Sequence, residues 1–422
     1  MRVLGISLGV VCIVAAGVTP VTAGGIDNRT NWSAEYIRTL NRNAAIDSAD
    51  IAAYNPAGIM KMANGAYVNL SAQYVAKTYT NNVNGTDLES DEPSIVPGLF
   101  GIYKKDKWAT YAAVTINSGG GRVKFNNGDA RTRIAGSTVI NSGIATSIIE
   151  EKVKGKSYYI GYTVGGAYAI NEVVSVSLAA RYIDATLKLD GTLSLSGGLS
   201  PTYDAEYEKT AGGWGAIIGI DLAPTDRLNI GMRYETVTKL NFKYKVTDLV
   251  SPAFLPPLLA NNNPPITDGM KERRDLPALL GLGISHQCTP KLRAEANLTY
   301  YFDENADWNG DENNVGNGYD VGLAIEYIFN DRIKGSVGYL YTDVDQAAQY
   351  KLPENPALGA STVGAGIVYT PKPAIDLNFS VAKVFYEDAS YTDVTSGTPL
   401  AIEYKKDIIF LALGAQYKFD LK

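Results

Sequence analysis

Histidine, cysteine and long apolar runs are scarce in this 422-residue sequence, which has one histidine and two cysteines. The histidine, His286, has no serine motif that would make it half of a nucleophilic pair. The sequence also lacks a Cys/His cluster for a transition metal and a glycine-rich phosphate loop between a strand and a helix. We therefore expect a protein that is not an enzyme, with no catalytic residue, no metal site and no cofactor.

Apolar runs of membrane-helix length are missing as well. Residues 1–23 combine Arg2, an apolar stretch and the small residues Val21-Thr22-Ala23, which is typical of a secretory signal peptide. No later segment reaches the roughly 18–20 apolar residues that a membrane helix needs. Cys12 leaves with the signal, so Cys288 has no partner for a disulfide. The net charge of −6 gives no reason to expect nucleic acid as a partner.

Alternating apolar and polar residues are what the sequence has in quantity. In 173–190 one face is apolar and the other carries most of the polar residues: Val174, Val176, Leu178, Ala180 and Tyr182 against Ser175, Ser177, Ala179 and Arg181. Segments 227–246 and 291–302 alternate in the same way. A soluble β-sandwich also alternates, but its strands are usually nearer five or six residues long. The pattern favours a transmembrane barrel, the only structure besides a helix that can span a bilayer.

We predict an all-β fold, an antiparallel barrel of roughly fourteen strands, an even number as in bacterial outer-membrane barrels. The predicted spans are 66–78, 94–105, 108–118, 156–170, 173–190, 203–223, 227–246, 275–287, 291–302, 317–329, 332–344, 360–370, 374–387 and 403–419. Tight connections such as 106–107 and 330–331 should face the periplasm, because barrels of this kind have short turns on that side. The long connections should face outside: 79–93, 119–155, 191–202, 247–274, 303–316, 345–359 and 388–402.

Residues 24–65 precede the barrel and show no strand pattern. They contain the motif Asn55-Pro56-Ala57-Gly58, in which Asn55 can cap a helix and Pro56 suits its first position. A short N-terminal segment with Asn-Pro-Ala before a fourteen-stranded barrel resembles the FadL family of transporters of long-chain fatty acids and hydrophobic compounds, toluene and xylene uptake included. The resemblance extends to 276–283, which lead into the eighth strand. The chain departs from the family pattern at 118–121, where Ser-Gly-Gly-Gly replaces Pro-Phe-Gly.

The resemblance implies three parts: a signal peptide (1–23), a small helical hatch in the lumen (24–65) and a transmembrane barrel with long extracellular loops (66–422). It implies passive, hatch-gated uptake of a hydrophobic small molecule through the bacterial outer membrane by a monomer. Asn55, Pro56, Ala57 and Gly58 would form the gate. The substrate would bind the outer loops first, enter an apolar lumen pocket, and leave past the hatch or sideways through a strand defect.

Two outer loops carry apolar residues that suggest ligand contacts. Segment 249–266 holds Phe254, Leu255, Leu258 and Leu259 among five prolines, and exposed apolar surface of this size asks for an explanation. These residues form either a landing site for the substrate or a lid packed on other loops, and both readings stay open. Ile140, Ile144 and Ile148 recur at helical spacing, which predicts a short helix over 137–151. Ile144 would pack against the 249–266 segment or share a groove with it.

The lumen face of the predicted strands combines charged and apolar side chains. The arginines there are Arg181, Arg233 and Arg293, with Glu235, Glu295 and Glu326 as possible partners. Arginine can hold a substrate carboxylate with two hydrogen bonds, but mutual arginine–glutamate pairing is the commoner reason for such a set. Leu279, Ile328 and Phe410 also point inward, where a water-filled porin would want polar residues. We therefore expect a partly apolar lumen.

Further partners follow from the ends and rims of the barrel. The alternating finish 413–419 is typical of the signal that barrel-assembly machinery reads, although three residues follow Phe419. Lys271, Arg273 and Arg274 would reach lipopolysaccharide phosphates at the rim, or form only a solvated face. A general porin and a structural or adhesive barrel are the alternative functions. Residues 24–65 argue against a porin, whereas loop sequences alone do not exclude an adhesive barrel.

Overall fold

Antiparallel strands form a closed barrel in the computed structural model, which describes residues 29–197, 200–250 and 266–419. Closure comes from β1 and β18, whose register runs from Ala66↔Phe419 to Val83↔Ile402. The strands are β1 (Gly65–Val83), β2 (Thr86–Ser90), β3 (Ser94–Lys105), β4 (Trp108–Phe125), β5 (Ser147–Ala169), β6 (Val174–Ser196), β7 (Thr202–Thr225), β8 (Leu228–Glu235), β9 (Asn241–Val250), β10 (Lys271–Arg273), β11 (Leu279–Thr289), β12 (Leu292–Tyr301), β13 (Tyr319–Asn330), β14 (Ile333–Asp343), β15 (Ala360–Lys372), β16 (Ile375–Tyr386), β17 (Ala389–Asp393) and β18 (Leu400–Phe419).

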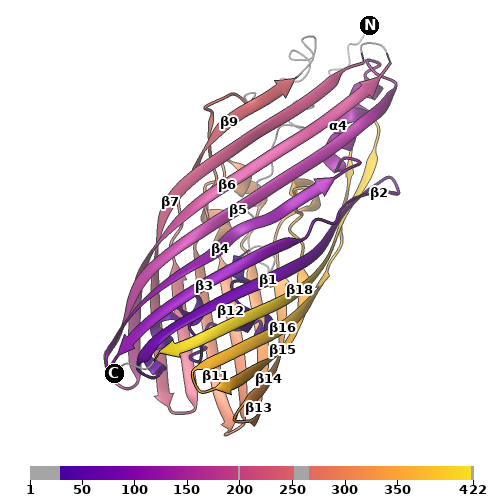
Figure 1. The fold of residues 1–422 in the computed structure, drawn as a ribbon. Coiled ribbons are helices and arrows are strands. Elements are labelled where there is room, and N and C mark those ends of the chain that lie inside the picture. The colour runs from indigo at the N-terminus through magenta and orange to yellow at the C-terminus, as the bar shows by residue number, and fades with distance from the viewer. Residues whose placement is uncertain (1–28, 198–199, 251–265, 420–422) are drawn as a thin grey trace.

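The predicted count of wall strands is confirmed. Of the 18 strands, β2, β10 and β17 are short additions, and β8 and β9 are two parts of one wall strand, which leaves fourteen. The strands β5, β6 and β7 reach the top of Figure 1, and β9 also ends near the top. The loops predicted at 79–93, 119–155 and 191–202 are therefore shorter than expected, because β1, β4, β5 and β6 continue into them. Alternation persists in these extensions, with buried Leu187, Leu189 and Leu193 on the inner face of β6.

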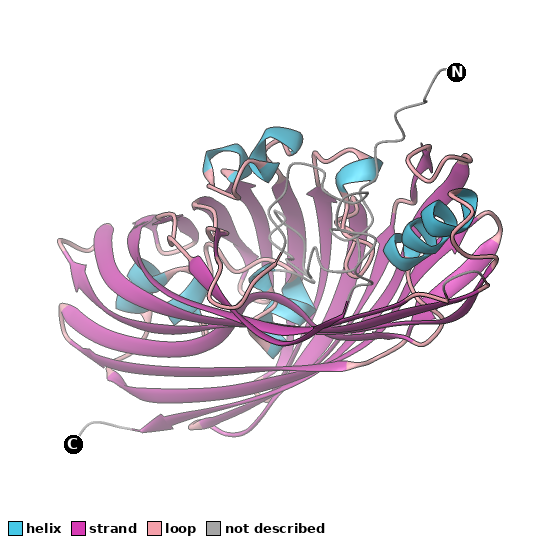
Figure 2. Ribbon diagram, turned by 90° about the horizontal axis from the view of Figure 1, so that it is seen from above, coloured by secondary structure: helices cyan, strands magenta, loops and turns pink. Residues whose placement is uncertain are grey.

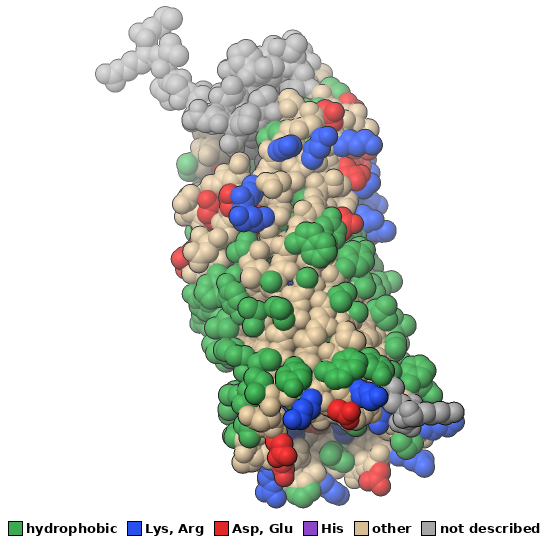
Figure 3. Space-filling model, turned by 90° about the vertical axis from the view of Figure 1, so that its left-hand side faces the viewer, with side chains coloured by type: hydrophobic (Ala, Val, Ile, Leu, Met, Phe, Trp, Pro, Cys, Tyr) green, Lys and Arg blue, Asp and Glu red, His purple; other side chains and the backbone are tan. Residues whose placement is uncertain are grey.

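The predicted faces of the strands are confirmed by burial. On β6, Leu178 is 63% exposed whereas Arg181 is 3% exposed, and on β8, Met232 is 39% exposed whereas Arg233 is 1% exposed. Apolar side chains form a band around the middle of the molecule, and charged side chains lie above and below it (Figure 3). This band is the surface that an outer-membrane barrel presents to lipid.

One predicted strand is broken. The span 227–246 divides into β8 and β9, and residues 236–240 leave the ladder except for a single bridge between Thr238 and Leu276. The segment turns inward across the lumen side of β7. A Cβ on Gly213 would lie 2.4 Å from the carbonyl oxygen of Lys239, and a Cβ on Gly215 would lie 2.6 Å from Oγ1 of Thr238. Only glycine at these two positions of β7 lets the segment approach so closely.

Short helices lie on the inner side of the curved wall, as Figure 2 shows from above. Inside the lumen are α2 (Ala34–Thr39), α3 (Ile51–Tyr54) and the 3-10 helix η2 (Pro56–Lys61). At the extracellular end α4 (Ala130–Asn141) contacts β1, β5 and β6. The helix predicted over 137–151 was therefore misplaced: α4 begins at an Asp129–Thr132 capping box and β5 starts at residue 147. None of the described helices is long and apolar enough to cross a membrane.

Candidate functional site

The described part of the predicted hatch, residues 29–65, fills the lumen and is almost entirely buried. Ser33 begins α2 by accepting a 3.0 Å hydrogen bond from the backbone N–H of Tyr36, and its hydroxyl donates to Asp50 at 2.7 Å. The Tyr36 and Tyr54 rings stack with centroids 5.4 Å apart, and Trp32 lies 5.0 Å from Tyr54. These contacts hold α2 and α3 together as one small apolar body within the barrel.

The predicted gate residues lie where this hatch meets the wall. Asn55 separates α3 from η2, and Pro56 starts η2 as its position in the motif predicts. The Asn55 amide donates to the carbonyl oxygen of Ala45 at 3.1 Å and to Asp221 of β7 at 2.7 Å. The carbonyl oxygen of Ala57 accepts a 2.9 Å hydrogen bond from the hydroxyl of Ser175 on β6.

Gly58 completes the motif for a steric reason. A Cβ at this position would lie 2.3 Å from the Asn55 amide nitrogen and 3.1 Å from Asp221. A larger residue would therefore displace the amide from its acceptor on the wall. Asn55, Ala57 and Gly58 thus act together as a fastening between the hatch and strands β6 and β7.

The lumen arginines form ion pairs within the protein. Arg181 pairs with Glu235, and Nε of Arg233 lies 3.2 Å from the same carboxylate. Arg233 also donates to the carbonyl oxygen of Ala53 in the hatch, and its guanidinium lies 5.6 Å from the Trp32 ring centroid. Mutual pairing, the commoner explanation for such a set, therefore accounts for Arg181 and Arg233, with two cations sharing one carboxylate.

Arg293 belongs to a second charged cluster near the periplasmic end. Its guanidinium lies 3.3 Å from Glu326 of β13 and 3.6 Å from Asp47 of the hatch. Asp47 also lies 3.0 Å from the ammonium of Lys334 on β14 and 2.8 Å from Arg42 within the hatch. The hatch is thus tied to the wall by ion pairs on this side and by Asn55 on the other.

The apolar residues predicted to face inward divide into two groups. Leu279 and Phe410 are fully buried, Leu279 against Tyr301 and Phe410 in the main core. Ile328 is half-buried on β13, close to the turn at residues 331–332, and lies apart from this core. Ile144 packs against the main core from the segment after α4. The predicted loop contacts Phe254, Leu255, Leu258 and Leu259 lie outside the described residues.

The wall has a discontinuity beside the hatch. The pairing of β3 with β4 runs only from Leu99↔Val114 to Lys105↔Trp108, whereas β3 continues to pair with β1 as far as Ser94. Above this point β4 bulges, with register shifts against β5 at residues 116–121 and positive φ at Gly119 (103°) and Gly121 (75°). Three consecutive glycines, 119–121, were the sequence signal for this defect, which alternation alone did not locate.

The hatch residue Trp32 occupies this discontinuity. Its indole N–H donates a 2.8 Å hydrogen bond to the carbonyl oxygen of Ile116 on β4. Its own carbonyl oxygen lies so close to β3 that a Cβ on Gly98 would come within 2.2 Å of it. Trp32 therefore contacts both strands on either side of the gap.

Two cavities that the described residues line beside the hatch are small. A cavity between the gap and Phe410 measures about 20 Å³, and another between Tyr36, Arg233 and Asp320 measures about 10 Å³. A cavity that holds benzene measures about 150 Å³. A ligand of that size would have to displace side chains to occupy either of these two cavities.

Carboxylates surround the rim cations that were predicted to reach lipopolysaccharide. Arg273 pairs with Asp275 at 2.8 Å, and Arg274 pairs with Asp311 and, at 2.8 Å, with Glu272. Both arginines are therefore engaged in ion pairs, and Arg274 is only 14% exposed, whereas Lys271 is exposed. Nearby, in the loop after β12, burial raises the pKa of Asp303 to about 7, although Arg29 opposes the shift. The residues that the structure describes contain no cluster of His, Cys, Asp or Glu that would hold a metal.

Comparisons with known proteins agree with this geometry. The family model described as "Outer membrane protein transport protein (OMPP1/FadL/TodX)" matches residues 14–419. A FadL homologue from Pseudomonas aeruginosa has a similar fold, with a TM-score of 0.71 at 15% identity over 92% of this chain and 98% of that one. The toluene transporter TbuX from Ralstonia pickettii has a TM-score of 0.65 at 14% identity, over 96% of this chain and 100% of that one. The toluene transporter TodX from Pseudomonas putida has a TM-score of 0.65 at 15% identity, over 95% of this chain and 100% of that one. No curated protein matches the sequence.

Proposed function

Because this chain belongs to the outer-membrane transport protein family that includes FadL and TodX, we propose that it is a passive, hatch-gated channel for hydrophobic small molecules, long-chain fatty acids or hydrocarbons. The observation that carries this proposal is the hatch itself. It fills the lumen, yet separate hydrogen bonds and ion pairs fasten it to the wall, among them Asn55 to Asp221 and Trp32 to Ile116. Contacts of this kind can be broken one group at a time, as a gate requires.

The closed lumen separates this function from that of a general porin. A porin keeps a polar, water-filled channel, whereas Leu279, Phe410 and the hatch aromatics occupy this lumen. Transport would depend on burial of apolar surface, roughly 0.8 kcal/mol per methylene. That free energy must be distributed over successive sites, because a single deep site would trap the ligand.

We propose that the exit route is the discontinuity between β3 and β4. It adjoins the cavity next to Phe410 and is closed by Trp32. A displacement of Trp32 would open a sideways path from the lumen toward the lipid-facing side of the wall. Asn55, Pro56, Ala57 and Gly58 would gate this path indirectly, since they position the hatch that carries Trp32.

The lumen charges favour a substrate with a carboxylate. Arg181 and Arg233 share the single carboxylate of Glu235, which leaves a formal positive charge in a buried place. A fatty-acid carboxylate would balance that charge and accept arginine hydrogen bonds. Contacts of the acyl chain with Leu279, Phe410 and Ile144, and with Phe254, Leu255, Leu258 and Leu259 in the outer loop, belong to the same proposal. Arg293 has three carboxylates near it, and Ile328 lies apart from the core, so neither is favoured.

Equilibrium binding tests the function. Labelled oleate and toluene are titrated separately into the purified protein in a short-chain detergent, with Arg181→Gln and Asn55→Ala alongside. We expect saturable binding of oleate that weakens in Arg181→Gln. Saturable binding of toluene alone would assign a neutral hydrocarbon instead. If neither ligand binds saturably, the channel proposal is wrong and a structural or adhesive barrel becomes the better reading.

Three further assignments belong to this proposal. Residues 1–23 would be removed as a signal peptide, residues 24–65 would act as the hatch, and residues 66–422 would form the barrel. The mature chain would work as a monomer. Its partners would be outer-membrane lipids, including lipopolysaccharide, and the barrel-assembly machinery, which would read the alternating finish of β18 up to Phe419.

A further inference from the structure

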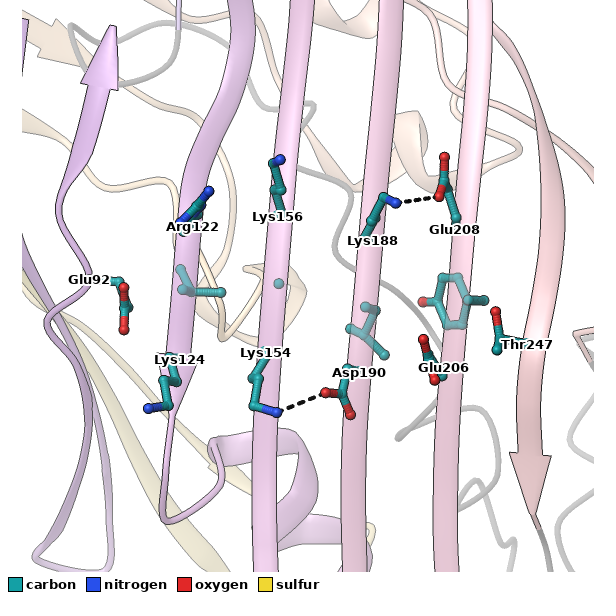
Figure 4. A pocket seen from close by; sticks show the side chains of 14 residues that line it. Glu92, Arg122, Lys124, Lys154, Lys156, Lys188, Asp190, Glu206, Glu208 and Thr247 are labelled. Carbon is teal, nitrogen blue, oxygen red and sulfur yellow. Dashed lines mark hydrogen bonds and ion pairs between the residues drawn. The ribbon is translucent and has the colours of Figure 1, made fainter.

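A groove crosses the outer face of the barrel where strands β4 to β7 rise above the apolar band. It measures about 420 Å³ and lies between two rows of charged side chains (Figure 4). The row nearer the band comprises Arg122, Lys156, Lys188 and Glu208, directly opposite one another on adjacent strands. The second row comprises Lys124, Lys154, Asp190 and Glu206. In these rows β4 and β5 carry only cations, β6 carries Lys188 and Asp190, and β7 carries only carboxylates.

The groove begins where the lipid-facing surface ends. The outward residues of β5 run from Tyr168 near the periplasmic turn through Val164 and Tyr162 to Tyr158. These ten residue steps span roughly 34 Å along the strand and roughly 24 Å in height at a tilt of about 45°, close to the apolar band of about 25 Å in such barrels. The next outward residue is Lys156, whose ammonium lies 5.2 Å from the Tyr158 ring centroid. The cations thus lie at the level of lipid headgroups.

Cations outnumber carboxylates in the lining of the groove by only one: Arg122, Lys124, Lys154, Lys156 and Lys188 against Glu92, Asp190, Glu206 and Glu208. Lys188 pairs with Glu208 at 2.6 Å, and Lys154 pairs with Asp190 at 2.9 Å. Arg122, Lys124 and Lys156 form no ion pair with any residue in the described part of the chain. Arg122 and Lys156 moreover lie opposite each other on neighbouring strands, an arrangement that is unfavourable for like charges. An anion between them would relieve this repulsion.

We propose that this groove binds the phosphate groups of lipopolysaccharide in the outer leaflet, with Arg122, Lys124 and Lys156 as the contacts. The guanidinium of Arg122 can hold two phosphate oxygens at once, and the lysines supply point charges beside it. A lipid occupant fits because the groove faces the bilayer side of the wall and its apolar neighbours, Tyr158 and Tyr162, would contact the acyl chains. The inference does not depend on what passes through the lumen.

Native mass spectrometry of the full protein in detergent tests this assignment with diphosphoryl lipid A as the probe. The variant Arg122→Gln/Lys124→Gln/Lys156→Gln should bind the probe roughly 100-fold more weakly, because it lacks three cations that each attract an anionic lipid. The matched control, Lys291→Gln/Arg332→Gln/Lys372→Gln, removes the same charge at exposed positions of the periplasmic turns and should bind like the parent protein. An equal loss in both variants, or in neither, would overturn the proposal.

Two further arms separate the sources of the anion. Dephosphorylated lipid A should bind the parent and the variant equally weakly, and tight binding to the parent would show that phosphate is not recognised. Inorganic phosphate at millimolar concentration should not displace lipid A, and full displacement would assign a free-anion site instead. The heat-modifiable gel mobility of each variant checks that the barrel is folded. Lys156→Arg should keep binding, because it keeps the charge.

Discussion

The indole N–H of Trp32 donates a 2.8 Å hydrogen bond to the carbonyl oxygen of Ile116, at the place where β4 parts from β3. A residue of the hatch thus satisfies an acceptor of the wall beside a break in its ladder. The contact joins the two features that a gated sideways path requires: an opening and a removable stopper. A substitution at Trp32 should therefore weaken this contact without changing the rest of the barrel.

Trp32→Phe should make the closed channel leak. The substitution keeps an aromatic ring but leaves the part-buried carbonyl oxygen of Ile116 without this donor, at a cost of about 1–2 kcal/mol. A change of that size raises the open population roughly 5- to 30-fold. Conductance in planar bilayers measures the leak. Trp214→Phe is the matched control, since Trp214 is 69% exposed on the lipid-facing side; an equal leak in both variants would contradict the stopper role.

Asn55→Asp should open the hatch further than Asn55→Ala. Alanine removes the hydrogen bonds to the carbonyl oxygen of Ala45 and to Asp221, and Asp221 retains a 2.7 Å hydrogen bond from Asn229. Aspartate places a second carboxylate against Asp221, and like charges at this distance repel. We expect entry of a small hydrophilic dye into proteoliposomes to increase in the order parent, Asn55→Ala, Asn55→Asp. Asn126→Ala, at an exposed position outside the hatch, should behave as the parent does.

Glu235→Gln should destabilise the protein strongly. Arg181 and Arg233 both depend on this carboxylate, and leaving buried charges without their partner costs about 3–5 kcal/mol. Thermal unfolding in detergent should show a clearly lower midpoint, partly restored by Arg181→Gln in the same chain. Glu208→Gln removes the partner of Lys188 on the outer face, where the pair is exposed and worth about 0–1 kcal/mol. Equal shifts for Glu208→Gln and Glu235→Gln would refute the buried cluster.

Asp303→Asn should stabilise the protein at pH 8 but not at pH 4. Burial raises the pKa of Asp303 to about 7 from its ordinary value of 3.8, so the folded state holds its proton up to about pH 7. The contribution of this group to stability is complete below pH 3.8 and is lost as the pH rises through 7. Asparagine mimics the protonated acid and should remove that loss. Unfolding midpoints of both proteins at the two pH values check this, and a gain that is equal at both would argue against the raised pKa.

Much of the barrel followed from the sequence because each spanning strand alternates with a period of two residues. The same local rule placed Arg181 and Arg233 on the lumen face and Leu178 on the lipid face. This local rule did not predict features that depend on residues distant in the sequence. Residues 236–240 fell inside the predicted strand 227–246, yet they turn inward, and the glycines at 213 and 215 on the neighbouring strand leave room for them.

The sequence predicted several residues of the candidate site, but not the residues that they contact. The Asn55-Pro56-Ala57-Gly58 motif identified the hatch edge, but neither Asp221 nor Ser175 could be named as its wall partners, since tertiary packing alone brings them together. The role of Trp32 was missed for the same reason. Spacing of isoleucines placed a helix at 137–151, whereas the Asp129 cap decides where α4 begins.

A reversible crosslink between hatch and wall tests the central claim most directly. A Cβ built on Gly219 of β7 lies 3.6 Å from Cβ of Ala57, within the disulfide range of about 3.5–4.5 Å. It also lies 2.4 Å from Oγ of Ser177, so that hydroxyl must rotate away. Ala57→Cys/Gly219→Cys, in a Cys288→Ser background, can therefore be locked by oxidation and released by reductant. Labelled oleate and toluene uptake by cells carrying this variant in the outer membrane should stop on oxidation and return on reduction. Uptake that continues with the hatch fully crosslinked would contradict a hatch-gated channel.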